Sequence, residues 1–186
     1  MSDPTSEQEL LRRARRGDDK AFRTLVERHE SVVAATVNSM LGPGDEADDV
    51  GQETFIRFYS ALGEFREEAA LKTYLTRIAI NLSLNALKRQ RRFHARYVET
   101  DLPRIMPDAD LDPAEQIESL EVRDTVRRAI DSLAPKHRAV VTLRLIDGYS
   151  TRETAEILGV PQGTVLSRLS RALKILKPRL QPTLDR

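Results

Sequence analysis

Lysine and arginine side chains gather in two stretches of the chain, and both stretches have the chemistry to bind a phosphate backbone. The first holds five bases in nine residues with two aromatic residues interleaved, namely Lys88, Arg89, Arg91, Arg92 and Arg96 with Phe93 and Tyr97. The second runs from Ile157 to Leu184, contains no acidic residue, and carries Arg168, Arg171, Lys174, Lys177 and Arg179. Because a run of charge is also typical of a solvated helix face, the elements that carry the bases must decide between the two interpretations.

The second basic stretch lies in a pattern that is typical of a helix-turn-helix. Ser150 and Glu153 form an S-x-x-E capping box at the start of a short helix, and Gly159 can take the left-handed conformation that ends this helix. Pro161 suits the start of a second helix, because a backbone N–H has no helical partner at that position.

The predicted second helix separates apolar residues from polar and basic ones. Helical spacing places four apolar residues on one buried face, namely Val165, Leu169, Leu173 and Leu176. The other faces carry polar and basic residues, which include Ser167, Arg168, Ser170 and Arg171. Such a helix can enter a DNA major groove. An ordinary helical hairpin with a solvated basic face remains the alternative.

Apolar residues recur at helical spacing through most of the chain and predict an all-α fold. Four helices are expected over residues 6–16, 20–41, 45–62 and 71–96, with breaks at Gly17, at 42–44 and at 63–70. Asp18 or Asp19 is expected to cap the second of these helices. A helix resumes near Ala114, where the residues expected to face a core are Ile117, Leu120, Val122, Val126, Ile130 and Leu133. The next helix begins at Pro135 and is closed by Gly148, and its apolar set is Val140, Val141, Leu143 and Leu145.

Charge is distributed unevenly and predicts two domains. The net charge of +1 divides into +1 over residues 1–98, −7 over residues 99–121 and +7 over residues 122–186. The stretch that follows residue 98 has three prolines, many acids and little periodicity, which favours a linker. We therefore expect two small helical domains, 1–98 and 114–186, joined by a flexible acidic linker over 99–113.

Composition excludes several classes of protein. The chain has no cysteine, so a disulfide framework is excluded and a reducing cytoplasm is the expected compartment. Its polar amino terminus does not resemble a signal peptide, and no apolar run approaches the roughly 20 residues of a membrane helix. Direct insertion into a membrane is therefore not expected.

No group of residues predicts catalysis, a metal site or a cofactor. His29, His94 and His137 are far apart in sequence, and no glycine-rich phosphate cradle or nucleophile elbow occurs. One acidic cluster lacks the spacing of a calcium loop and suits the first turn of a helix instead, and its members are Asp45, Glu46, Asp48, Asp49 and Glu53.

Two long blocks resemble the second and fourth conserved domains of the extracytoplasmic-function (ECF) bacterial sigma factors. The first is DEADDVGQETFIRFYSALGEFREEAALKTYLTRIAINLSLNALKRQRR and the second is LAPKHRAVVTLRLIDGYSTRETAEILGVPQGTVLSRLSRALKIL. The resemblance covers nearly everything outside the linker, in the right order and spacing, and its architecture is most similar to the RpoE-like members.

The resemblance implies a non-enzymatic subunit that joins core RNA polymerase and directs it to promoters. In the family the helix that begins near Asp48 docks on the clamp coiled coil of the largest polymerase subunit. The matching positions here are Asp48, Asp49, Gln52, Glu53 and Ile56. Carboxylates and an amide among apolar residues can meet an arginine-rich partner helix, although the alternative is that these acids only solvate their own helix.

The resemblance also assigns recognition and melting of the −10 element to the first domain. Asn81 matches an asparagine that contacts a flipped base, and an amide can read a base edge with two hydrogen bonds. Its expected neighbours are Phe65, Arg66, Lys72, Tyr74 and Arg77, and the expected phosphate contacts are Lys88, Arg89, Arg91 and Arg92. For Phe65 and Tyr74, packing in the core is the competing assignment.

The second domain would read the −35 element and contact another polymerase subunit. The positions that match base-facing ones are Leu166, Ser167, Ser170 and Arg171, and those suited to phosphates are Thr164, Arg168 and Lys174. The acidic linker would thread the RNA exit path, or serve only as a tether. The family also implies an anti-sigma factor, which could hold the chain at the inner membrane.

Three residues depart from the family pattern. Most relatives have tryptophan where this chain has Tyr74, an aliphatic residue at Gly51, and often arginine or lysine at Leu166. Glycine within a helix costs about 1 kcal/mol relative to alanine, so Gly51 loosens the predicted docking helix. Leu166 could touch a thymine methyl group, or be neutral.

Two other functions are alternatives to that of a sigma factor. A stand-alone helix-turn-helix regulator would leave the first block, Asp45 to Arg92, unexplained. A protein-interaction module that sequesters a regulator would leave both basic stretches unexplained.

Overall fold

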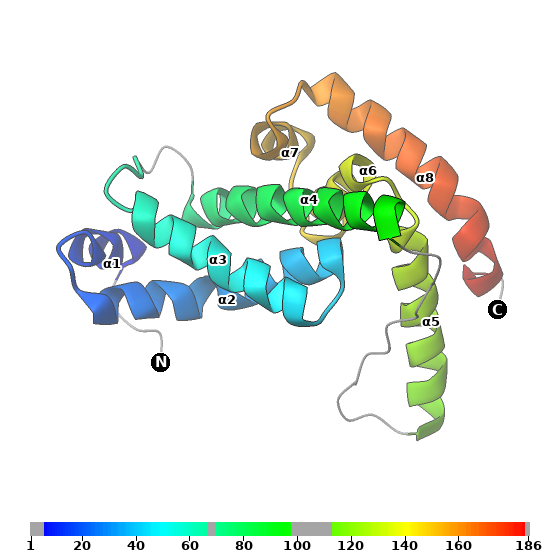
Figure 1. Ribbon diagram of the computed structural model, residues 1–186, viewed down its shortest axis with the longest axis horizontal. Helices are drawn as coiled ribbons and strands as arrows, with labels where there is room; N and C mark the ends of the chain where they lie inside the picture. Colours follow the sequence, from blue (N-terminus) through cyan, green and yellow to red (C-terminus); the bar gives the residue numbers. More distant parts are fainter. Residues whose placement is uncertain (1–5, 67–69, 98–112, 185–186) are drawn as a thin grey trace. The chain divides into compact units, whose positions relative to one another are not determined.

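The computed structural model describes the backbone of residues 6–66, 70–97 and 113–184, and every regular element in these ranges is a helix. The helices are α1 Glu7–Ala14, α2 Asp19–Leu41, α3 Asp45–Ala61, α4 Leu71–Tyr97, α5 Pro113–Asp131, α6 Pro135–Val141, α7 Thr151–Leu158 and α8 Gln162–Leu184 (Figure 1). A π-helical segment, η1, continues α6 over Thr142–Ile146. The all-α prediction is confirmed. The predicted linker lies outside the described residues, apart from Pro113 at the start of α5.

The described residues divide into two compact units, and the division falls within α4, after Ser83. In the first unit, α1 and α3 both pack on α2, and α2 runs alongside α3 (Figure 1). The core is apolar, and its most fully buried side chains include Leu11, Leu25, Val33, Val37, Met40, Phe58, Leu71, Leu75 and Ile80. This core fixes the exposed faces of α3 and α4.

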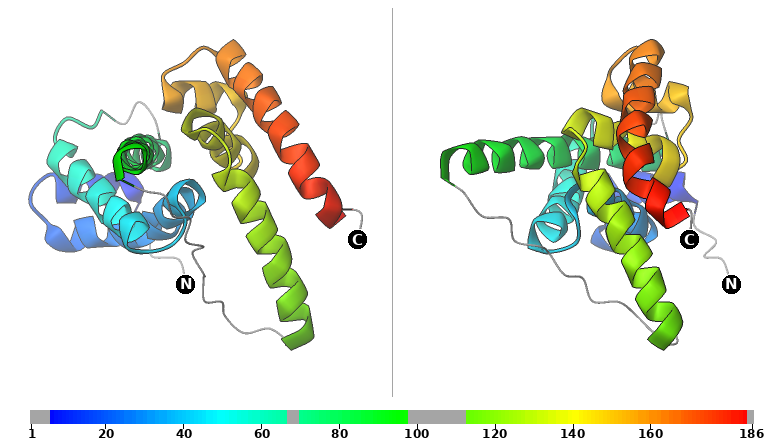
Figure 2. Two further views of the ribbon diagram at one scale, coloured as in Figure 1. Left: turned by 45° about the vertical axis from the view of Figure 1, so that its right-hand side comes forward. Right: turned by 90° about the vertical axis from the view of Figure 1, so that its right-hand side faces the viewer.

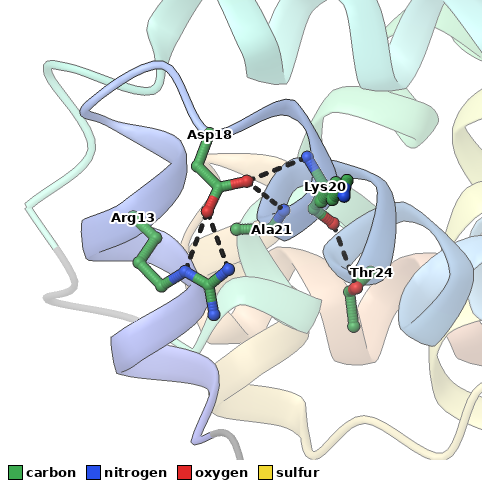
Figure 3. Close-up of polar contacts among 5 residues, drawn as sticks. All are labelled: Arg13, Asp18, Lys20, Ala21 and Thr24. Atoms are coloured by element: carbon green, nitrogen blue, oxygen red, sulfur yellow. Dashed lines mark hydrogen bonds and ion pairs between the residues drawn. The ribbon is translucent and has the colours of Figure 1, made fainter.

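The corner between α1 and α2 is held by a capping network around Asp18 (Figure 3). One carboxylate oxygen of Asp18 accepts hydrogen bonds from the backbone N–H groups of Lys20 and Ala21 at 3.0 and 3.1 Å, and the other accepts two from the Arg13 guanidinium at 2.9 and 2.7 Å. The Arg13 hydrogen bond, followed by that of Ala21, lowers the pKa of Asp18 below its ordinary value. The predicted cap and the break at Gly17 are confirmed.

In the second unit, α8 packs against α5, α6 and α7 and closes two small cores. One consists of Ala129, Leu133, Val141, Ala172 and Leu176, and the other of Val140, Ala155 and Val165. The capping box is present, with Glu153 N–H donating to Ser150 Oγ at 3.2 Å and Ser150 N–H donating to Glu153 Oε2 at 2.8 Å. Gly159 takes the left-handed conformation at φ 62°, so the predicted helix-turn-helix geometry is confirmed.

The predicted buried face of α8 was wrong at one position. Leu173 is 45% exposed, and Ala172 is buried in its place. Because successive helical residues are rotated by about 100°, position 172 lies about 20° from Val165, whereas position 173 lies about 80° away. The core therefore takes the small alanine, and the leucine is left outside.

Three further apolar residues of the second unit are more exposed than predicted. Leu145 is 53% exposed because it lies in η1, where the wider π-helical turn rotates it away from the face that carries Val141. Val122 and Val126 are 39% and 36% exposed. Both precede Ala129, where α5 joins the core of the second unit. The N-terminal end of α5 extends past the end of α8 (Figure 2).

Candidate functional site

The exposed face of α3 is acidic, with one large apolar residue. Asp48, Asp49 and Gln52 are exposed, and Ile56 is 59% exposed. The opposite face is buried in the first core through Ala47, Val50, Thr54 and Phe58. The helical period therefore holds the carboxylates outward. Their position in the first turns of the helix is also favourable, because acids stabilise the positive end of the helix dipole.

Two further residues shape this face of α3. Glu53 is half-buried and accepts a hydrogen bond from Arg57 Nε at 2.8 Å, one turn along the helix. Tyr59 is 51% exposed, and its ring packs edge-on against Phe22 with the centroids 4.8 Å apart. Tyr59 is not among the residues predicted for this face, although the helical spacing from Gln52 through Ile56 to Tyr59 places it there. The face offers carboxylates and apolar area to a basic protein surface.

Half of the predicted −10 residues share one stripe of α4. Counted at about 100° per residue, one side of the helix carries Tyr74, Arg77, Asn81, Lys88 and Arg92. All but the half-buried Tyr74 are exposed. The buried side of the helix holds residues such as Leu75, Ala79 and Ala86. A stripe of cations with an amide in its middle suits a nucleic-acid strand.

The other predicted −10 residues lie off this stripe. Arg66, Lys72, Arg89 and Arg91 are exposed on the preceding loop or on other sides of α4. They can widen the positive surface, but they do not all face one strand.

Phe65 lies in the core, as the packing alternative stated. It is 7% exposed, and its ring is 4.8 Å from that of Tyr74 and 6.0 Å from that of Phe58. Arg15 reinforces the position by donating hydrogen bonds to the backbone carbonyl groups of Leu62 and Phe65. Stacking of a base on Phe65 would require this cluster to open. Tyr74 is half-buried at its edge, so only part of its ring faces outward.

The helix-turn-helix presents its predicted residues on the outside of α8. Leu166 is 55% exposed, and the other exposed members are Ser167, Ser170, Arg171 and Lys174. Thr164 and Arg168 are half-buried, and Thr164 offers its carbonyl oxygen to Ser167 Oγ at 3.1 Å. The buried residues Val165, Ala172 and Leu176 anchor the opposite side. The N-terminal half of α8 therefore carries hydroxyl and cationic groups outward, as a helix in a major groove requires.

His137 lies near these cations, although its sequence position predicted no role in this surface. Both ring nitrogens are buried and lack a hydrogen-bond partner. Burial lowers the pKa of His137, and the positive charges of Lys136, Arg171 and Arg168 lower it further. The charges of Lys136 in α6 and of Arg168 and Arg171 in α8 act on the same imidazole. Lys136 therefore adds a cation from α6 to the positive surface around α8. Such a surface suits phosphate.

Comparison with family models matches both parts of the chain. Residues 25–93 match the model described as Sigma-70 region 2, and residues 123–176 match the model described as Sigma-70, region 4. The first match contains the α3 face and the α4 stripe, and the second contains the helix-turn-helix. In the described part of the chain, no helix is both long enough and apolar enough to cross a membrane.

Known relatives match the chain along its whole length. An ECF RNA polymerase sigma-E factor of Salmonella typhimurium is 37% identical, and the match covers 100% of each chain. The structure of CnrH in complex with the cytosolic domain of CnrY is similar, with a TM-score of 0.66, 27% identity and coverage of 95% of this chain and 97% of that one. A sigma factor RpoE bound to the anti-sigma factor NepR, from Bartonella quintana, shares the fold, with a TM-score of 0.67, 22% identity and coverage of 87% and 98%.

Proposed function

Because the chain belongs to the ECF RNA polymerase sigma factors, we propose that it binds core RNA polymerase and directs transcription initiation by recognising −10 and −35 promoter elements. The main observation behind the proposal is that the two matched regions carry surfaces of opposite charge. The α3 face is acidic and partly apolar, whereas the surfaces of α4 and α8 are basic. One protein partner and one nucleic-acid partner account for both.

Each predicted domain has its own role in the proposal. Residues 1–98 would dock on the polymerase clamp through Asp48, Asp49, Gln52, Glu53 and Ile56. They would also open the −10 element with Asn81 at the centre of the α4 stripe. Residues 114–186 would read the −35 element with α8. The exposure of Asn81 and Arg171 supports these roles, since a group that reads a base edge must reach beyond the protein surface. The acidic stretch 99–113 would connect the two domains.

Control by an anti-sigma factor is part of the proposal. CnrH, a relative with 27% identity, was solved with the cytosolic domain of a second protein. By analogy, we propose that an inhibitory protein binds this chain in the bacterial cytoplasm and competes with polymerase, and that it can retain the chain at the inner membrane. Sigma factors are non-enzymatic initiation subunits, and we extend this to the present chain. A stand-alone regulator is not favoured, because it would not need the α3 face.

Binding to core polymerase tests the proposal. The full chain should elute with bacterial core RNA polymerase in gel filtration, and the complex should retain a promoter duplex at a salt concentration that removes core polymerase alone. A chain that stays separate from core polymerase but binds an operator by itself would contradict the proposal and support the stand-alone regulator.

A further inference from the structure

The imidazole of His137 is a polar group to which the second unit offers no hydrogen-bond partner. Both ring nitrogens are buried, and neither makes a hydrogen bond within the described part of the chain. A buried polar group without a partner destabilises a fold. An apolar residue of similar size would fill the same space without this cost, so packing alone does not explain a histidine at this position.

His137 lies on the side of α6 that faces α8. Val140 and Val141 follow it by three and four residues, so the three side chains share one side of the helix. Val140 packs in one core with Val165 of α8. Val141 packs in the other core with Ala172 of α8. This side of α6 therefore faces the stretch of α8 between positions 165 and 172, which also carries two arginines of the proposed −35 surface.

The charges that act on His137 are positive. Burial lowers the pKa of the imidazole, and three cations lower it further, namely Lys136 on α6 with Arg171 and Arg168 on α8. Other charged groups of α6 and its neighbours have partners of their own: Arg138 forms an ion pair with Asp131 of α5 at 3.0 Å, and Arg144 of η1 donates to the carbonyl oxygen of Tyr149. The imidazole is therefore neutral in the free chain near pH 7.

Phosphate groups would reverse this balance. In the proposed complex a phosphate of the −35 element pairs with Arg168 and others lie near Arg171, so negative charge offsets the cations that keep His137 neutral. Because a nearby opposite charge favours the charged form of a titratable group, the pKa of His137 should rise when DNA binds. A protonated imidazole also has two N–H donors, and its charge attracts the same phosphates.

We propose that His137 takes up a proton when −35 DNA binds, and that the affinity of the second unit for DNA therefore depends on pH. His137 is a positioning residue in this role, because it acts through Arg168, Arg171 and the phosphates that they hold. Coupling between two ligands is reciprocal, so a proton whose uptake DNA favours will in turn favour binding of DNA. Affinity for the −35 element should increase as pH falls from the slightly alkaline range. Proton uptake in this form presupposes the proposed DNA contact of α8.

Duplex binding at two pH values tests this role. The probe is a duplex that the full chain retains from a random pool, labelled with a dye whose fluorescence does not depend on pH, and anisotropy is measured at one fixed salt concentration. Between about pH 7.5 and about pH 6.5 the affinity should increase about three- to tenfold, because one proton changes a binding constant at most tenfold per pH unit. His137→Gln should abolish the increase.

Two matched variants separate His137 from general effects of pH and charge. His29→Gln removes an imidazole of the first unit, which contacts Glu7 at 2.7 Å, and it should retain the increase. Lys177→Ala removes an exposed cation further along α8. It should lower the affinity by the same factor at both pH values and so retain the increase as well.

Nuclear magnetic resonance of the unsubstituted chain gives a readout that does not depend on how well a variant folds. At about pH 7 the ring C–H resonances of His137 should move to the positions of the charged form when the duplex is added. Resonances that stay at the neutral positions, or an affinity that His137→Gln leaves just as dependent on pH, would overturn proton uptake while the proposed function stands. If the chain retains no duplex and directs no start site with core polymerase, the proposed function fails, and proton uptake by His137 fails with it.

Discussion

The α3 face and the α8 face are built alike and carry opposite charge. Each lies on a helix whose other side is buried in the core of its own unit, and each exposes large apolar residues, Ile56 on α3 and Leu166 with Leu173 on α8. Each helix also contains a glycine, Gly51 or Gly163, at which an added Cβ would meet nothing within 4 Å. On α3 the polar residues of the face are mainly carboxylates, whereas on α8 they are hydroxyl groups and cations.

Charge, rather than shape, therefore distinguishes the partners of the two faces. A phosphate backbone repels the carboxylates of α3 and attracts the cations of α8. Basic protein surfaces have the opposite preference. The exposed leucines of α8 add apolar area that a phosphate backbone cannot use.

Reversing one charge on the α3 face should have the largest effect on binding. Asp49→Lys should weaken binding to core polymerase at least tenfold, because it brings like charges together where opposite charges met. Binding of an isolated −35 duplex should not change. Gel filtration and anisotropy measure the two effects, with Glu30→Lys on α2 as a matched control for net charge. Equal losses in both assays would show that the substitution acts through overall charge or folding.

Removal of the Arg171 side chain should weaken binding of −35 DNA and leave binding to core polymerase unchanged. Arg171→Ala should reduce −35 recognition by roughly 1–3 kcal/mol if the guanidinium reads a base edge, with core binding intact. Arg179→Ala, at an exposed arginine further along α8, is the control. Titrations at one fixed salt concentration should compare the preferred duplex with a scrambled one. The same loss on both duplexes would mean that Arg171 only holds phosphate.

A substitution of Asn81 tests whether different residues of the first unit bind polymerase and contact DNA. Asn81→Ala should slow promoter opening with little loss of core binding, because its amide would compensate the few kcal/mol that unstacking a base costs. Opening can be followed by the fluorescence of 2-aminopurine placed in the −10 element. Gln8→Ala removes an exposed amide on α1, away from the α4 stripe, and should have no such effect. Weakened association of Asn81→Ala with core polymerase would contradict the assigned role.

The two units should respond to acid at different pH values. Burial lowers the pKa of His137 from its ordinary value of 6.5, so the unfolded chain binds this proton more readily and the second unit loses stability as pH falls below about 6.5. The pKa of Asp18 in the first unit is also lowered, but this reduces the stability of the unit only as the pH falls toward and below the ordinary value of 3.8. Hydrogen exchange at pH 7 and pH 5.5 should therefore show loss of protection in α6 and α8 and none at the α1–α2 corner. His137→Gln should remove the difference, and its persistence in that variant would exclude His137 as the cause.

The two glycines should give the smallest effects. Gly51→Ala should raise the free energy of unfolding by about 1 kcal/mol, because alanine favours the helix and its Cβ meets nothing. Gly163→Ala should stabilise α8 less, since it lies in the first turn, and should weaken duplex binding a few-fold where a methyl group faces the phosphates. Denaturant unfolding and anisotropy measure these changes. Destabilisation by Gly51→Ala would show that α3 needs its glycine.

Local rules were enough to predict most of the fold. The capping box at Ser150, the left-handed Gly159 and the cap at Asp18 depend on residues two to four positions apart, and all three are present. The helical period also separated the exposed Asp49 and Gln52 from the buried Phe58. The resemblance to a family assigned roles that spacing alone could not.

The errors arose where tertiary packing decides. The π-helical turn over Thr142–Ile146 exposes Leu145, and no apolar period predicts an extra residue in a turn. Whether Phe65 faces a base or the core, which the sequence left open, depends on the rings of Phe58 in α3 and Tyr74 in α4 that pack against it. The electrostatic setting of His137 likewise depends on Arg168 and Arg171 from another helix.

The central claim is that one chain joins polymerase through an acidic face and selects promoters through basic ones. Transcription of genomic DNA from the bacterium that encodes the chain, with purified core polymerase and mapping of RNA 5′ ends, tests it most directly. We expect start sites that occur only when the chain is added, that share two upstream sequence elements, and that disappear with Asp49→Lys. Start sites that are the same with core polymerase alone would contradict the account.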